Sequence, residues 1–124
     1  MQDRKYVIMI IDDDPDFITA MRMVLEANGY IVKDSKSAEE GLKAYKNINP
    51  DLILVDLMME EVDSGTNFVK ELKLLGNKAP VFLLSAAGDE MIHNVDYTKL
   101  GFAGVFQKPI QNERLLSVLK AKLK

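Results

Sequence analysis

Hydrophobic residues along the chain alternate between two patterns. Short continuous apolar runs are typical of strands that are buried on both faces of a sheet. We expect such strands at residues 6–11, 30–33, 51–55, 80–84 and 103–106, of which the second is the weakest. After each run, apolar residues recur three or four positions apart, which predicts an amphipathic helix. We expect these helices to begin near residues 15, 37, 66, 91 and 112.

Capping residues support these helix boundaries. Asp14 and Pro15 suit the N-cap and the first position of the first helix. Ser37 and Glu40 have the spacing of a capping box at the second helix. Glycines, which favour the left-handed turn after a helix, end three of the helices at Gly29, Gly76 and Gly101.

The order of these elements predicts the fold class. Five strand–helix repeats predict one α/β domain over residues 1–124, with no separate output domain. This alternation favours a doubly wound parallel five-stranded sheet, (βα)5, with helices on both faces. In such sheets the functional crevice lies at the carboxyl ends of the strands.

Composition and charge narrow the classes of function. The formal net charge is −3, which argues against direct binding of nucleic acid. The chain has no cysteine and one histidine, which excludes disulfides, thiolate metal sites and multi-histidine metal sites. No apolar run approaches the length of a membrane span, and the N-terminus does not resemble a signal peptide. We therefore expect a cytoplasmic protein that makes no contact with a membrane.

The carboxyl ends of the predicted strands carry residues that together suggest chemistry. Asp12 and Asp13 end the first strand, Asp56 ends the third, Ser85 the fourth, and Lys108 follows the fifth. Each alone could be a cap, a turn residue or a solvated side chain. A lone carboxylate at the end of a buried strand is costly without a partner, however. Since parallel strands bring their carboxyl ends to one edge, we expect the five residues to converge.

The charges of this group indicate what it binds. Its three carboxylates and one ammonium leave a negative balance that a divalent cation would neutralise. All-oxygen ligation favours Mg²⁺ (or Mn²⁺), which is held by a few carboxylates together with substrate phosphate. A carboxylate can also act as a nucleophile and form an acyl phosphate. Phosphoryl transfer needs mainly positioning and charge neutralisation, which the metal, Lys108 and Ser85 would supply.

Four motifs make the chain resemble the receiver domain of two-component response regulators over essentially its whole length. They are IIDDDPDF, DLILVDLMM, PVFLLSA and VFQKPI. The resemblance implies a flavodoxin-like receiver fold and a phosphorylation-dependent signalling switch rather than an enzyme. It makes Asp56 the phosphoacceptor, and a sensor histidine kinase or a histidine phosphotransfer protein the phosphodonor.

Two further properties of the acceptor site follow from the resemblance. Asp12, Asp13, Asp56 and the backbone carbonyl of Met58 would be the ligands of Mg²⁺. The side chains of Met58 and Ala87 would flank the approach of water to the acyl phosphate. Since neither side chain can orient a water molecule, we expect slow self-dephosphorylation, over many minutes or longer.

The resemblance also implies how the signal leaves the site. Ser85 and Lys108 would contact the phosphoryl group, and Ala86 would leave the phosphate accessible. Phe106 matches the switch aromatic, which we expect to turn inward and to reshape the surface of the fourth helix, fifth strand and fifth helix. That surface would bind a downstream protein, or a second copy in a phosphorylation-dependent dimer. The bond between Lys108 and Pro109 is expected to be cis.

Two surface features complete the expectations. In the family the first helix carries much of the kinase contact, which makes Thr19 and Arg22 candidates for that interface. The loop after the third strand, EEVDSG at residues 60–65, departs from the family pattern. Family members often have proline at its first position and Asp-Gly at its fourth and fifth. We therefore expect a rebuilt loop there.

Three other functions use similar folds or site residues. A phosphohydrolase of the haloacid dehalogenase type would need a second aspartate two residues after the nucleophile, where this chain has Met58. An FMN carrier would need a hydroxyl- and glycine-rich loop after the first strand, where three aspartates would repel the phosphate. A receiver-like interaction module that is never phosphorylated would not need the complete set of site residues.

Overall fold

The computed structural model describes residues 5–56, 64–86 and 101–123, and it confirms the predicted alternation of strands and helices. The strands are β1 (Val7–Ile11), β2 (Ile31–Ser35), β3 (Leu52–Asp56), β4 (Val81–Ala86) and β5 (Gly104–Lys108). The helices are α1 (Pro15–Ala27), α2 (Ala38–Ile48), α3 (Ser64–Leu74) and α5 (Asn112–Lys122). None of these described helices is long and apolar enough to cross a membrane. The helix predicted from residue 91 and the loop residues 60–63 lie outside the described residues.

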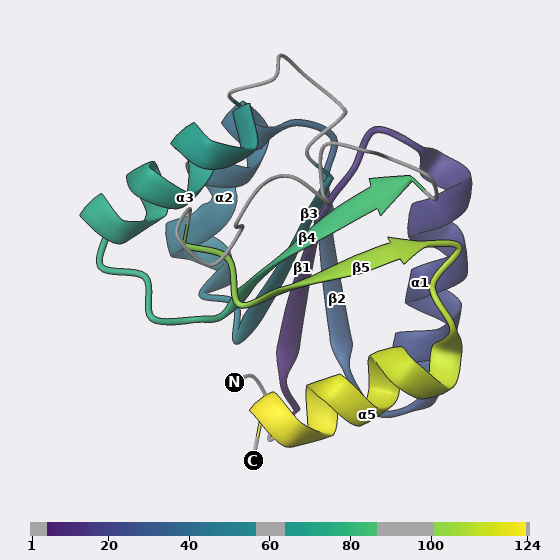
Figure 1. Ribbon diagram of the computed structural model, residues 1–124. Helices are drawn as coiled ribbons and strands as arrows, with labels where there is room; N and C mark the ends of the chain where they lie inside the picture. Colours follow the sequence, from purple (N-terminus) through teal and green to yellow (C-terminus); the bar gives the residue numbers. More distant parts are fainter. Residues whose placement is uncertain (1–4, 57–63, 87–100, 124) are drawn as a thin grey trace.

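All five strands are parallel and form one sheet in the order β2-β1-β3-β4-β5. Helices α1 and α5 cover one face of this sheet, and α2 and α3 cover the other (Figure 1). The chain leaves β1 toward β2 on one side and later returns to β3 on the other side. The carboxyl ends of β1 and β3 therefore flank the crevice that this type of sheet offers to ligands.

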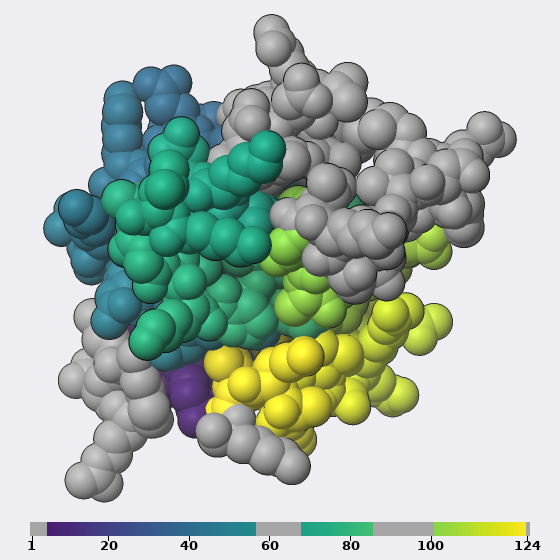
Figure 2. All heavy atoms as spheres, turned by 60° about the vertical axis from the view of Figure 1, so that its left-hand side comes forward, coloured from purple at the N-terminus to yellow at the C-terminus, as the bar shows by residue number. Residues whose placement is uncertain are grey.

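Alternate strand residues supply two hydrophobic cores, one on each face of the sheet. In β1, Ile8 and Ile10 pack on the side of α1 and α5, whereas Met9 and Ile11 pack on the side of α2 and α3. All five residues of β1 are buried, as expected for a central parallel strand that is covered on both faces. Figure 2 shows α3 lying beside α2 over the second face.

Most strands extend one or two residues past the ends of their predicted apolar runs, as β2 and β5 show. β2 continues to Ser35, which pairs with Ile11 of β1. β5 continues to Lys108, which pairs with Ala86 of β4. In both cases the polar residues stay in the strand because their backbone groups pair with a neighbour. The hydrophobic pattern predicts where these strands begin more closely than where they end.

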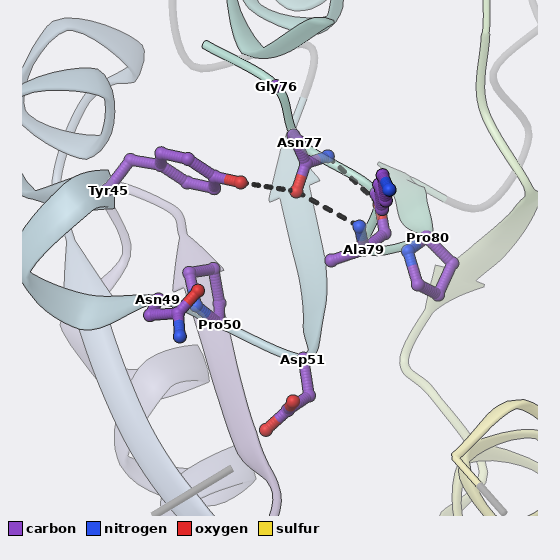
Figure 3. Close-up of a pocket in the computed structure, with 9 residues that line it drawn as sticks. Tyr45, Asn49, Pro50, Asp51, Gly76, Asn77, Ala79 and Pro80 are labelled. Carbon is purple, nitrogen blue, oxygen red and sulfur yellow. Dashed lines mark hydrogen bonds between the residues drawn. The ribbon is translucent and has the colours of Figure 1, made fainter.

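The amino-terminal edge of the sheet is held by a polar contact between α2 and the segment before β4. The Tyr45 hydroxyl donates a hydrogen bond to Asn77 Oδ1 at 2.8 Å, and Oδ1 also accepts from the Ala79 N–H at 3.0 Å (Figure 3). These residues line a pocket beside Asp51, whose carboxylate accepts from the Val7 N–H at 2.8 Å. This edge lies opposite the carboxyl ends of the strands.

Tyr45→Phe tests the contribution of this contact to stability. The variant loses one hydrogen bond to Asn77, which keeps its bond from Ala79. We expect the fold to persist and the free energy of unfolding to fall by about 1 kcal/mol. Urea denaturation measures the difference. Tyr30→Phe is the control, because among the described residues the Tyr30 hydroxyl has no hydrogen-bond partner. An equal fall in both variants would contradict a specific role for the Asn77 contact.

Candidate functional site

Asp12 is a buried carboxylate at the end of β1, with 0% of its surface exposed. Its N–H donates to the carbonyl of Ser35 at 3.0 Å, which keeps it next to β2. Its Oδ1 accepts from the Asp14 N–H at 2.9 Å, and its Oδ2 accepts from Lys108 Nζ at 2.6 Å. Both oxygens therefore have donors, as a buried charged group requires.

Asp56 is the last residue of β3 and lies level with Asp12. The register of the sheet causes this, because Val55 pairs with Ile11, the residue before Asp12. The Asp56 side chain is 11% exposed, and its Oδ2 accepts from Lys108 Nζ at 2.8 Å. Two carboxylates from neighbouring strands thus approach one point at the edge of the sheet.

Lys108 is the last residue of β5, two strands away from β3. Its side chain is 22% exposed, and its ammonium donates to both Asp12 and Asp56. Strand side chains alternate, so Lys108 lies on the same face of β5 as the buried Phe106, on the side of α1 and α5. The ammonium joins three strands through charge-assisted hydrogen bonds, which are the stronger kind.

The surroundings shift the pKa of two of these groups. Burial raises the pKa of Asp12 above the ordinary aspartate value, although the hydrogen bonds from Lys108 and from the Asp14 N–H act against this. Burial alone would lower the pKa of Lys108, but its bonds to Asp12 and Asp56 outweigh burial, and the pKa is raised. Lys108 therefore stays charged at neutral pH and places a fixed positive charge beside Asp56.

Ser85 is buried near the end of β4, with 1% of its surface exposed. It lies on the same face of β4 as Leu83, on the side of α2 and α3. Within the described part of the chain, its Oγ has no hydrogen-bond partner. A buried hydroxyl without a partner costs about 1–3 kcal/mol. Ser85 therefore has an unused donor close to the carboxyl edge of the sheet.

Phe106 is buried in β5, with 2% of its surface exposed. Its ring packs against Phe82, with 5.2 Å between the ring centroids, and the Arg114 guanidinium lies 5.7 Å from its centroid. In this structure the ring is part of the core under α1 and α5. The movement of Phe106 on phosphorylation stays a prediction. The bond between Lys108 and Pro109 is cis, as predicted.

Other predicted residues are not brought into this group. Asp13 is exposed, and among the described residues no three acidic or histidine side chains form a group that could hold a metal ion. Ala86 ends β4 and pairs with Lys108 through the backbone. Met58 and Ala87 lie outside the described residues, so slow self-dephosphorylation stays a prediction.

The two helix residues predicted at a kinase interface differ in their surroundings. Thr19 is exposed on α1. Arg22 is only partly exposed, and its guanidinium donates to the Val32 carbonyl at 3.0 Å and forms an ion pair with Asp34. Arg22 therefore ties α1 to β2, and reversing its charge would disturb the fold as well as a surface.

Sequence reasoning missed one contact of the site. Phe17 belongs to the apolar pattern of the first helix, and it packs against the core under α1 and α5. Its ring centroid also lies 4.3 Å from Lys108 Nζ. The sequence feature that could have predicted this contact is the helix start at Asp14 and Pro15, directly after β1. Such a start keeps the first helical turn at the edge of the sheet where the polar residues meet.

Asp12 gives the pocket a measurable pH dependence. Its pKa is raised from 3.8 in the folded state, so the folded chain holds this proton more tightly than the unfolded chain. Stability therefore falls as the pH rises from the ordinary pKa to the raised pKa, and no further above it. Asp12→Asn lacks this titration. We therefore expect the free energy of unfolding of the variant, minus that of the wild type, to increase as the pH rises across this window.

Urea denaturation at several values between about pH 4 and 8, with a metal chelator present, measures this difference. Asp51→Asn at the opposite edge is the control for the loss of a carboxylate. A difference between Asp12→Asn and the wild type that stays constant with pH would contradict the raised pKa of Asp12.

Comparison with known proteins identifies the family. The chain matches the family model of the response regulator receiver domain over residues 8–120. The response regulator protein TodT of Pseudomonas putida is 32% identical over 124 residues, which cover 100% of this chain and 54% of TodT. The chemotaxis protein CheY of Bacillus subtilis is 28% identical over 117 residues, which cover 94% of this chain and 96% of CheY. The chain thus spans about half the length of TodT and almost the whole of CheY.

Solved structures have the same fold. The chemotaxis protein CheY4 of Vibrio cholerae superposes with a TM-score of 0.82 at 22% identity, covering 96% of this chain and 99% of that one. A response regulator receiver domain protein from Clostridium thermocellum superposes with a TM-score of 0.82 at 23% identity, covering 95% of this chain and 94% of that one. Receiver domains are generally signalling modules without enzyme activity of their own. With its family motifs, its parallel sheet and its acidic pocket, this chain belongs to the receiver domain family of two-component response regulators.

Proposed function

We propose that this chain is a cytoplasmic switch that accepts a phosphoryl group on Asp56 from a sensor histidine kinase or a histidine phosphotransfer protein. The observation that carries the proposal is the Lys108 ammonium, which lies 2.8 Å from Asp56 Oδ2 and 2.6 Å from Asp12 Oδ2. This cation stands where negative charge would be added if a phosphoryl group joined Asp56. The chain would act as a phosphoacceptor rather than as an enzyme that turns over a substrate.

The transfer step needs a nucleophile and neutralisation of charge. A carboxylate oxygen of Asp56 attacks the phosphorus, and the bond from phosphorus to the donor breaks as the new oxygen–phosphorus bond forms. The donor leaves with the electron pair of the broken bond. The linkage at Asp56 becomes neutral and carries a phosphoryl group of about −2 charge. Lys108 contacts the acceptor before transfer, and the Ser85 hydroxyl, which has no partner among the described residues, can donate to a phosphoryl oxygen.

The acidic residues of the pocket suit a Mg²⁺ ion. Mg²⁺ prefers carboxylate oxygens and commonly needs only one or two of them, with waters completing its shell. Asp12 and Asp56 would hold the ion, and Asp13 and the Met58 carbonyl are the further ligands that the family pattern implies. Mn²⁺ suits the same oxygen donors. A bound ion would supply charge neutralisation to the phosphoryl oxygens.

Asp56→Asn tests the acceptor. Asparagine has nearly the same shape, but its amide is not a nucleophile, so we expect phosphorylation to be abolished and the fold to persist. Incubation with a small phosphodonor and Mg²⁺, followed by intact mass spectrometry, should show one added phosphoryl group in the wild type and none in the variant. Asp51→Asn makes the same chemical change at the opposite edge and should be phosphorylated like the wild type. Phosphorylation of Asp56→Asn would refute the assignment.

We expect phosphorylation to reach the protein surface through β5. Phe106 lies two residues before Lys108 on the same face of the strand, and its ring contacts both Phe82 and the Arg114 guanidinium of α5. A new ligand for Lys108 would change the position of the strand end and thereby the packing of this ring and of Arg114. The response would be a shift between two packings of one fold. It would alter the face of β5 and α5 that a downstream protein or a second copy could bind.

Beryllofluoride, which mimics a bound phosphoryl group, tests this coupling. In the presence of Mg²⁺ it should shift the NMR signals of the Phe106 ring and of the Arg114 side chain, because both would repack. The ring signals of Tyr45, at the opposite edge of the sheet, serve as the control and should stay in place. Shifts confined to Asp12, Asp56 and their sequence neighbours would show that the signal does not travel through Phe106.

A further inference from the structure

Phe17 belongs to a closed set of contacts around the pocket. Asp12 Oδ1 accepts from the Asp14 N–H at 2.9 Å, and Asp14 Oδ1 accepts from the Phe17 N–H at 3.4 Å. The Phe17 ring centroid lies 4.3 Å from Lys108 Nζ, which donates back to Asp12 Oδ2 at 2.6 Å. These four residues join the end of β1, the first turn of α1 and the end of β5. The ring of Phe17 is therefore placed by the same carboxylate that binds the ammonium.

We propose that Phe17 is a positioning residue for phosphoryl transfer, whose ring holds the Lys108 ammonium against the pocket carboxylates. The inference rests on the proposed function of Asp56. An aromatic ring carries negative potential on its face and attracts a cation within about 6 Å of its centroid. The attraction is stronger when the cation is partly removed from water, and the Lys108 side chain is only 22% exposed.

The ring differs from the two carboxylates in how it responds to the reaction. When Asp56 becomes an acyl phosphate, its carboxylate charge is lost and its ion pair with Lys108 weakens. Asp12 would be shared with the metal ion. The Phe17 ring has no charge to lose and binds no metal, so its attraction for the ammonium persists through both changes. It also adds no negative charge that would repel an incoming phosphoryl group.

A purely structural role for Phe17 makes different predictions. The residue packs against the core under α1 and α5, and an aliphatic side chain of similar size would fill much of that space. Only an aromatic ring supplies the electron-rich face toward Lys108. The electron density of the ring therefore separates the two roles, because it can be changed without changing the size of the side chain.

Site-specific replacement of Phe17 by mono-, di- and trifluorinated phenylalanine withdraws electron density from the ring in steps. We expect the second-order rate constant for phosphorylation by a small phosphodonor with Mg²⁺ to fall with each added fluorine. For Phe17→Leu we expect a fall of about fivefold, which corresponds to about 1 kcal/mol. The same fluorinated series at Phe68, a buried residue of α3 on the other face of the sheet, should leave the rate constant unchanged. The free energy of unfolding of each variant verifies that the fold is retained.

A spectroscopic signature tests the contact without phosphorylation. A group above the face of an aromatic ring has its proton NMR signals shifted upfield. The side-chain protons next to Lys108 Nζ should show this shift in the wild type and lose it in Phe17→Leu. If the wild type is phosphorylated but fluorination of Phe17 does not change the rate constant, the proposed role of Phe17 is wrong and the proposed function still stands. A wild type that shows the Lys108 shift but accepts no phosphoryl group would overturn the proposed function, and the role of Phe17 with it.

Discussion

The ammonium of Lys108 is the interaction on which the pocket depends. Asp12 is fully buried and Asp56 nearly so, and the register of β1 and β3 brings their carboxylates to the same level. Two like charges at this spacing, largely removed from water, would favour protonation or local opening of the sheet edge. One cation that donates to both carboxylates reduces this penalty. The hydrogen bonds of Lys108 therefore stabilise both the acidic pocket and the packing of the strand ends at this edge of the sheet.

The alternation of strand side chains divides the pocket between two faces of the sheet. Asp12, Asp56 and Lys108 lie on the side of α1 and α5, where the first turn of α1 brings Phe17 to the ammonium. Ser85 lies on the side of α2 and α3, with no partner among the described residues for its hydroxyl. A ligand held at the strand ends can therefore be contacted from both faces. The two donors, the Lys108 ammonium and the Ser85 hydroxyl, lie on opposite faces of the sheet.

Hydrophobic patterning and caps were sufficient to predict the strands, the described helices and the convergence of Asp12, Asp56 and Lys108. These features follow from local sequence and from the rule that parallel strands end at one edge. The extension of β2 to Ser35 and the ion pair of Arg22 with Asp34 were not predictable in this way. Each depends on which neighbour a backbone or side-chain group meets after folding, and the sequence pattern does not encode that neighbour locally.

The contact between Asp12 and Lys108 joins residues that lie 96 positions apart in the sequence. Asp56 is synthesised early, together with strands β1, β2 and β3, but the cation that it contacts arrives only with β5. A chain that has not yet completed its sheet, or that has lost β5 through local unfolding, presents the carboxylates of Asp12 and Asp56 without the Lys108 ammonium. Under the proposed function, competence to receive a signal would require the complete fold, and immature or damaged copies would stay silent.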